Sequence, residues 1–180
     1  MKTGIVILTI SLIFALSSCK NEDSGNGKNT KQISRKEIKE AFIHANKRAN
    51  SVESEMIERY IERHKWNMTK TESGLRYNIY HKGEGLKAKQ GLICRLNYTV
   101  KLLDGTICYS SEDNGYKEFI LGKGNVESGL EEGVLLLHVG DKARFILPSH
   151  LAYGLIGDNN KIKGRSSIIY DVELVELFHK

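Results

Sequence analysis

The hydrophobic residues of this chain change their spacing along the sequence, and each change marks a new segment. They form a nearly continuous run from Ile5 to Leu16, which only Thr9 and Ser11 interrupt, and no large apolar residue occurs in residues 20–32. In the next part of the chain they recur at every third or fourth position, and beyond Gly74 they alternate with polar residues. We therefore divide the chain into four segments, which are residues 1–18, 19–33, 34–70 and 71–180.

The first segment has the layout of an export signal. Lys2 is the only charge before the apolar run, and the small residues Ser17 and Ser18 follow that run. A basic start, a short apolar stretch and small residues are the three parts of a signal peptide. The run is shorter than the roughly 20 residues that a membrane-spanning helix needs. We expect residues 1–18 to be a signal peptide, and residues 19–33, which have too little apolar surface to fold, to be a flexible tether.

The third segment has the spacing of an amphipathic helix. Ser34 and Glu37 are placed as a capping box at its start. Steps of three and four then draw one apolar stripe on the helix, at Ile38, Phe42, Ala45, Ala49, Val52, Met56 and Tyr60. Because Asn50 to Glu53 could cap a second helix, the arm is either one long helix or two helices joined near residue 50. The stripe either packs against the C-terminal domain, which we favour, or joins two chains as a homodimer through residues 34–66.

The fourth segment has the period of β-strands. From Leu92 to Leu102 apolar and polar residues alternate, which predicts a strand with one buried face. Asp104-Gly105 follows and predicts a hairpin turn, since both residues tolerate a positive φ. Further strands are expected at residues 75–81, 117–121, 143–147 and 167–177.

One short helix interrupts these strands. Ser128 and Glu131 are spaced as a second capping box, Leu130 and Val134 share a face, and Gly140 can end the helix. Several antiparallel strands and one amphipathic helix predict an α+β fold. We expect a curved antiparallel β-sheet, a half-barrel wrapped around the short helix, preceded by the N-terminal helical arm.

Charge and composition exclude two function classes. The net charge is +5, yet residues 71–180 hold 14 basic and 14 acidic side chains, and the excess lies in residues 19–70, with 12 against 8. A nucleic-acid-binding domain concentrates basic charge on its working face, so we expect no nucleic-acid partner. The six histidines show no metal-ligand spacing, and we expect no metal and no cofactor. Cys94 and Cys108 lie too far apart along the predicted hairpin for a disulfide, so we expect free thiols.

An ordered series of motifs in residues 71–180 resembles the FKBP-type peptidyl-prolyl cis-trans isomerases. The motifs are Asn97-Tyr98-Thr99, Leu103-Asp104-Gly105-Thr106, Phe119-Ile120-Leu121-Gly122, Gly129-Leu130-Glu131-Glu132-Gly133, Val139-Gly140-Asp141-Lys142-Ala143, Leu151-Ala152-Tyr153-Gly154 and Tyr170-Asp171-Val172-Glu173-Leu174. A series of this kind is more specific than any one motif. The resemblance implies an enzyme that rotates X-Pro bonds in proteins.

The resemblance also implies where the active site lies. An apolar bowl is expected from Tyr98, Val126, Leu130, Ile162 and Tyr170. The Tyr153 hydroxyl and the backbone N–H of Glu127 are expected to hold substrate carbonyls. Where the family usually has Phe-Asp, this chain has Cys108-Tyr109, so Tyr109 replaces a carboxylate of the pocket.

Two further departures from the family pattern make the site more polar. Lys117 stands at a common aromatic position, and the tip loop, residues 155–165, carries Lys161, Lys163 and Arg165. We therefore expect a reduced isomerase activity. The alternative is an FKBP-like binding or chaperone module of an envelope complex, with negligible catalysis.

The residues around Cys19 resemble the lipobox of bacterial lipoproteins, which implies a lipid on Cys19 and attachment to a membrane. Lys20 directly after the cysteine favours the outer membrane facing the periplasm, and the acidic residues Glu22 and Asp23 leave surface display open. Together with the isomerase motifs, the chain is similar to the gliding-motility-associated FKBP-like lipoproteins of Bacteroidetes. The partners expected from this resemblance are the X-Pro segments of exported proteins.

Overall fold

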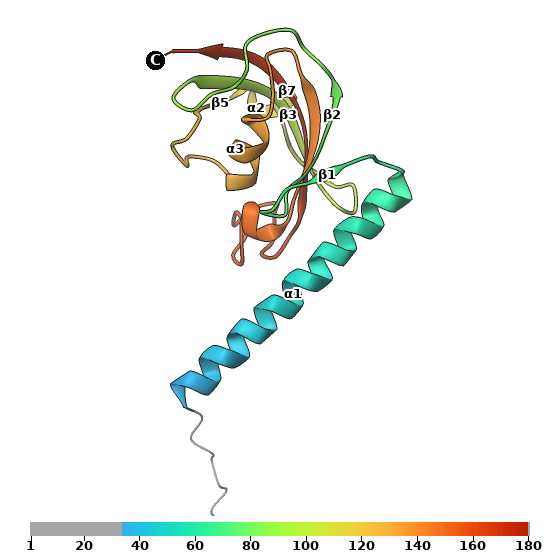
Figure 1. Cartoon of the computed structure of the whole chain (residues 1–180), viewed down its shortest axis with the longest axis vertical. Helices are drawn as coiled ribbons and strands as arrows, with labels where there is room; N and C mark the ends of the chain where they lie inside the picture. The colour runs from blue at the N-terminus through green and yellow to red at the C-terminus, as the bar shows by residue number, and fades with distance from the viewer. Residues whose placement is uncertain (1–33, 180) are drawn as a thin grey trace, which may run out of the picture.

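The computed structural model describes residues 34–179 and shows an α+β fold, as predicted (Figure 1). A curved antiparallel sheet forms the C-terminal domain, and a long helix lies across its outside. Cys19 and the predicted signal peptide and tether lie outside the described residues. Among residues 34–179, no helix is long and apolar enough to cross a membrane.

The sheet has seven strands, and all its pairs are antiparallel. Its order is β1-β2-β6-β7-β3-β4, and β5 extends the sheet beside the first residues of β3. The strands are β1 (Thr69–Lys70), β2 (Arg76–His81), β3 (Ile93–Leu102), β4 (Ile107–Ser110), β5 (Lys117–Ile120), β6 (Lys142–Leu147) and β7 (Ile168–Phe178). The predicted turn at Asp104-Gly105 joins β3 to β4, and Gly105 has the positive φ of 91° that the turn requires.

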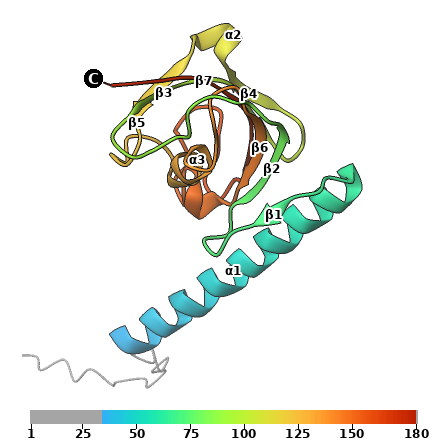
Figure 2. The ribbon, with the colours of Figure 1, turned by 45° about the horizontal axis from the view of Figure 1, so that its top comes forward.

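The sheet curls around α3 (Ser128–Val134), which fills its concave side (Figure 2). Alternation along the strands separates the two faces. In β6, Phe145 and Leu147 join the inner core around α3, whereas Ile146 joins a second cluster on the outer face. Successive residues of β6 therefore point into two different apolar layers, one on each side of the sheet.

Glycine allows α3 to approach the sheet closely. A Cβ atom on Gly133 would lie 2.7 Å from Cε2 of Phe145, and one on Gly129 would lie 2.7 Å from Cγ of Leu147. Both distances are shorter than carbon atoms allow. The helix can occupy the concave side of the sheet only because these two positions carry no side chain.

The helix α3 begins where it was predicted, within one residue, but the predicted capping box is absent and the predicted end is wrong. Its N-cap is Glu127, which makes no side-chain cap hydrogen bond. The Glu131 carboxylate accepts the backbone N–H groups of Gly122 and Lys123, so it does not complete a capping box. The helix ends at Val134, well before Gly140. Gly140 lies with a φ of 91° in the turn that leads into β6.

The arm is one continuous helix, α1 (Arg35–His64), without a joint near residue 50. Its predicted capping box is present, since the Glu37 N–H donates to Ser34 Oγ at 3.1 Å and the Ser34 N–H donates to Glu37 Oε2 at 2.8 Å. The helix ends where Lys65 adopts a left-handed conformation with a φ of 53°.

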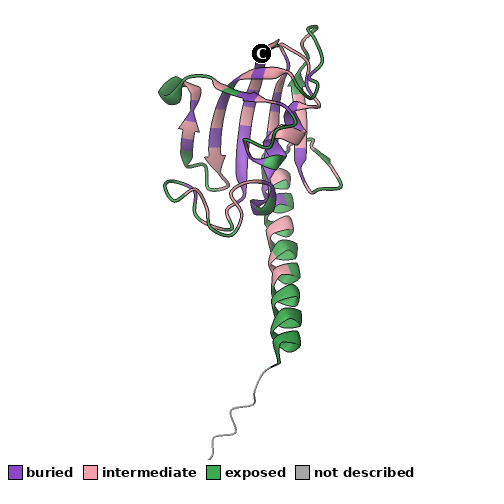
Figure 3. Ribbon diagram, turned by 90° about the vertical axis from the view of Figure 1, so that its left-hand side faces the viewer, coloured by how far each residue is buried: buried purple, intermediate pink, exposed green. Residues whose placement is uncertain are grey.

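Only the last turns of α1 pack by apolar contact on the outer face of the sheet. Ile57 and Tyr60 are buried there against Ile146 and Ile169. Figure 3 shows the burial decreasing along α1 toward its start, which extends past the domain. The prediction that the whole stripe packs on the domain is therefore wrong for its first part, as Phe42, for example, is 59% exposed.

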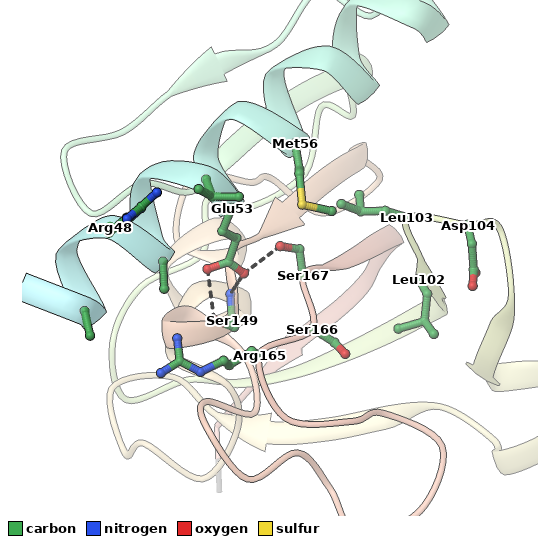
Figure 4. Close-up of a pocket in the computed structure, with 13 residues that line it drawn as sticks. Arg48, Glu53, Met56, Leu102, Leu103, Asp104, Ser149, Arg165, Ser166 and Ser167 are labelled. Atoms are coloured by element: carbon green, nitrogen blue, oxygen red, sulfur yellow. Dashed lines mark hydrogen bonds between the residues drawn. The ribbon is translucent and has the colours of Figure 1, made fainter. Parts of the chain in front are cut away.

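A polar contact fixes the middle of α1 to the domain (Figure 4). Glu53 accepts hydrogen bonds from the Ser149 N–H at 2.6 Å, the Ser149 hydroxyl at 2.9 Å and the Ser167 hydroxyl at 2.7 Å. Ser149 begins the 3₁₀ turn η1 (Ser149–Leu151), and Ser167 directly precedes β7. One carboxylate therefore connects the arm to two loops of the domain.

The two cysteines of the domain are free, buried thiols. Cys94 on β3 pairs in register with Phe119 on β5, whereas Cys108 lies on β4. A short helix, α2 (Ser111–Asn114), separates β4 from β5. The two thiols therefore belong to different strand pairs along β3.

Candidate active site

A hollow of about 410 Å³ opens near the start of α3. Three segments form it, namely the first residue of β5, the chain that enters α3, and the chain that follows η1. The residues that line it are Lys117, Gly124, Asn125, Val126, Glu127, Ala152 and Tyr153. Three of the predicted site residues, Val126, Glu127 and Tyr153, therefore meet in one concave site.

Glu127 places a carboxylate at the base of this hollow. Its side chain is only 5% exposed. Oε1 accepts a hydrogen bond from the Tyr170 hydroxyl at 3.1 Å. Oε2 has no hydrogen-bond partner among the described residues and lies 3.6 Å from Nζ of Lys117.

Lys117 lies over the aromatic part of the site. Its Nζ atom is 5.8 Å from the ring centroid of Tyr98 and 5.9 Å from that of Tyr170, and the two rings are 6.3 Å apart. An ammonium group at this distance is attracted by the ring faces and, here, also by Glu127. The two aromatic rings predicted for the bowl are thus brought together, with a lysine head group above them. Neither ring lines the open hollow, and Tyr170 is fully buried.

The tyrosines of the site keep their protons at neutral pH. Burial, and then the neighbouring Glu127 carboxylate, raise the pKa of Tyr153. Burial also raises the pKa of Tyr170 well above its usual value, and the charge of Glu127 adds to this effect. Tyr153, which lines the hollow, therefore offers a neutral hydroxyl that can donate a hydrogen bond.

Leu130 and Ile162 are fully buried in the same apolar cluster as Tyr98 and Tyr170. They do not line the open hollow. They support the rings from within the core, so a charged residue at Leu130 would unfold the domain rather than alter the site alone.

Tyr109 is turned toward the tip loop. Its hydroxyl donates to Asp158, whose other oxygen accepts the N–H groups of Asn160 and Ile162, each at 2.9 Å. Lys161 also holds this loop, since its Nζ donates to the Cys108 carbonyl at 2.8 Å. Tyr109 does not line the hollow. It fixes the loop that carries Ile162.

Sequence reasoning missed two features of the site. It used Glu127 only for its backbone N–H, whereas the side chain brings a buried charge beside Lys117. It also missed Asp158, although Asp158-Asn159-Asn160 has the composition of a turn in which the aspartate binds backbone N–H groups. Within the part of the chain that the structure describes, no three His, Cys, Asp or Glu side chains could hold a metal ion together.

A curled antiparallel sheet around one short helix, with a hollow at the start of that helix, is the architecture of an FKBP-type domain. The chain matches the family described as FKBP-type peptidyl-prolyl cis-trans isomerase over residues 84–175. It belongs to this family, whose enzyme class is EC 5.2.1.8.

Several known proteins are similar to this chain. FK506-binding protein 2 of Dictyostelium discoideum is 43% identical over 91 residues, which are 50% of this chain and 68% of that protein. The FKBP-type isomerase FkpA of Aeromonas hydrophila is 41% identical over 107 residues, 59% of this chain but only 39% of that protein. The crystal structure of FkpA from Escherichia coli superimposes with a TM-score of 0.63 at 25% identity, covering 82% of this chain and 75% of that one.

Proposed function

We propose that this protein is a peptidyl-prolyl cis-trans isomerase that acts on exported or envelope proteins. The observation that supports this most directly is the hollow, in which Val126, the Glu127 backbone and the Tyr153 hydroxyl meet beside the rings of Tyr98 and Tyr170. Membership of the isomerase family supports the same reaction.

The chemistry requires neither a nucleophile nor a metal. The barrier of about 18–20 kcal/mol arises because the C–N bond loses its amide resonance as it twists. The twisted amide separates less charge than the planar one, so a hollow poor in water favours it over the ground state. Each preference of about 1.4 kcal/mol for the twisted form increases the rate tenfold.

The polar side chains of the hollow support a reduced rate. Lys117 and Glu127 introduce two charges next to the rings, and these charges stabilise the planar, more polar amide as well as retaining water. The same feature supports the alternative function, a binding or chaperone module of an envelope complex that holds proline-containing segments with negligible catalysis.

Filling the hollow tests the function. The purified protein should accelerate isomerisation of a short X-Pro peptide, and Val126→Arg should remove at least nine tenths of that acceleration because the long side chain occupies the hollow. Val175→Arg is the matched control, since Val175 lies on β7 with 37% of its surface exposed. Equal activity of the two variants, or no acceleration by the wild type at micromolar concentration, contradicts an isomerase site in this hollow.

We further propose that a lipid on Cys19 attaches the protein to the outer membrane, facing the periplasm, where it supports gliding motility or secretion. The support is the lipobox-like sequence Leu16-Ser17-Ser18-Cys19 and its resemblance to lipoproteins of gliding Bacteroidetes. Cys19→Ser should move the protein from the membrane fraction to the soluble fraction of the cell. Unchanged membrane retention of this variant would refute the lipid attachment.

The exposed part of the apolar stripe supports a homodimer through residues 34–66. Ala45, Ala49, Val52 and Met56 line one side of a groove of about 660 Å³, and Leu102 and Leu103 line its other side (Figure 4). Beyond this groove, Ile38 and Phe42 continue the stripe on the free part of α1. A second copy of α1 would cover this surface.

A further inference from the structure

The hollow contains one group that an isomerase pocket for apolar prolines does not need. This group is the Glu127 carboxylate, whose side chain is only 5% exposed. Oε1 is satisfied by Tyr170, but Oε2 has no hydrogen-bond partner among the described residues. A buried carboxylate oxygen without a donor is costly, so it attracts any donor that enters the hollow.

Lys117 is the only described cation that forms an ion pair with Glu127, and it does so at 3.6 Å. Its ammonium also lies over the rings of Tyr98 and Tyr170. Neither ring lines the open hollow, so a proline ring can reach these two aromatic faces only by taking the place of this ammonium. Entry of the substrate therefore removes Lys117 from Glu127.

The loss of Lys117 leaves the buried Glu127 carboxylate without a cation, so that only the neighbouring hydroxyls of Tyr170 and Tyr153 stabilise its charge, which is unfavourable. A substrate can compensate for it by bringing its own cation. The side chain of the residue that precedes proline is nearest to the bond that rotates, and a lysine or arginine there carries a hydrogen-bond donor on a long, flexible stem.

We infer that the Glu127–Lys117 pair makes this site selective for X-Pro segments in which a lysine or arginine precedes the proline. This inference rests on the proposed isomerase function and specifies its substrate class. In the bound state the substrate cation donates to Oε2 of Glu127, and Lys117 turns outward into the solvent at the mouth of the hollow.

A peptide series tests this selectivity. The purified protein is assayed with peptides that differ only in the residue before proline, which is lysine, leucine or glutamate. We expect kcat/KM to be about tenfold higher for lysine than for leucine, which is the effect of one hydrogen bond to a charged group. Glu127→Gln should bring this ratio close to one, because the neutral amide no longer requires a cation.

Lys117→Met is the complementary variant, because it should change the same ratio in the opposite direction. In the wild type, Lys117 at the mouth of the hollow still offsets part of the Glu127 charge while a leucine peptide is bound. Without Lys117 the leucine complex loses this stabilisation and the lysine complex does not, so the preference for lysine should increase several-fold. A ratio that Glu127→Gln leaves unchanged, a ratio that falls in Lys117→Met, or a preference for glutamate overturns the inference.

A binding measurement separates this inference from the isomerase proposal. If the wild type accelerates no peptide, the isomerase function fails, and calorimetric titration with the same peptides then decides the inference. Tighter binding of the lysine peptide that is lost in Glu127→Gln supports a site selective for cations. Equal binding of the lysine and leucine peptides overturns it.

Discussion

Cys94 in the inner core illustrates how burial dominates the chemistry of a side chain. Cys94 is completely buried on β3, and its thiol makes only a weak contact of 3.5 Å with the Phe119 carbonyl. Burial raises the pKa of this thiol from its usual value to about 12. Phe119 covers it from β5, so the thiol stays protonated and unreactive at neutral pH.

This raised pKa predicts a loss of stability in alkaline solution. The folded state keeps the Cys94 proton up to about pH 12, whereas the unfolded state loses it from about pH 9. The contribution is therefore complete below pH 9 and declines as the pH rises toward 12, by about 2 kcal/mol at pH 10.5. Urea unfolding at pH 7.5 and 10.5 should show a smaller decline in Cys94→Ala than in the wild type. The same decline in both proteins would contradict this assignment.

At the scale of single residues, three of the eight predicted site residues line one hollow, and the electrostatics of that hollow were not predicted. Val126, Glu127 and Tyr153 were predicted from the family motifs and do line one hollow. Motifs report which residue occupies a position, but not which way its side chain points. For this reason Tyr109, which binds Asp158, was assigned to the pocket, and the carboxylate of Glu127 was overlooked.

Among the elements, the strands were predictable because alternation over several residues has no other common explanation. The predicted segments 75–81 and 143–147 differ from β2 and β6 by one residue each. By contrast, β1 and α2 have two and four residues, too few for any period to be recognised. The end of α3 was misplaced because Gly140 serves a turn rather than a helix terminus.

The close contact between α3 and the sheet predicts that even a methyl group is too large at Gly133. Gly133→Ala should destabilise the protein by about 1–3 kcal/mol, because the new Cβ overlaps the ring of Phe145 and the core cannot expand without strain. Ser128→Ala, on the exposed side of the same helix, should change the stability by less than about 0.5 kcal/mol. Chemical unfolding of both variants measures the difference. A Gly133→Ala protein as stable as the control would show that α3 can move away from the sheet.

The contact between α1 and the domain depends on Glu53. Glu53→Ala removes an acceptor for three hydrogen bonds and should increase hydrogen exchange in the middle of α1 about tenfold or more, since hydrogen bonds to a charged group contribute about 1.5–3 kcal/mol each. Glu55→Ala makes the same chemical change on the exposed side of the helix, where the carboxylate pairs only with Arg59. Exchange in this control should stay close to that of the wild type. Equal protection in both variants would mean that the apolar contact at Ile57 suffices to hold the arm.

At the scale of the whole molecule, the main feature is the part of the apolar stripe on α1 that the domain does not cover. From Ile38 to Met56 its steps are four, three, four, three and four residues, the heptad spacing of a coiled-coil seam. The domain buries the end of α1 through Ile57 and Tyr60 instead. The stripe therefore remains available to a second helix of the same kind.

The proposed dimer predicts that the molecular mass in solution depends on one exposed residue of the stripe, Phe42. In sedimentation equilibrium the wild type should have twice the mass of one chain, and Phe42→Glu should be monomeric because a charge then lies in the seam. Ile43→Glu is the matched control, since Ile43 is 53% exposed but lies outside the stripe, and it should remain dimeric. A monomeric wild type at tens of micromolar would refute the pairing of arms.

The unbroken helix also acts as a spacer of defined length. Thirty residues at about 1.5 Å each extend over roughly 45 Å, and Glu53 prevents the domain from swinging about this rod. Whatever is attached at Ser34 is therefore held at a fixed distance from the active site and in a fixed orientation to it. Deleting seven residues, about two turns, from the part of α1 that does not touch the domain would shorten that distance by about 10 Å and nearly preserve the orientation.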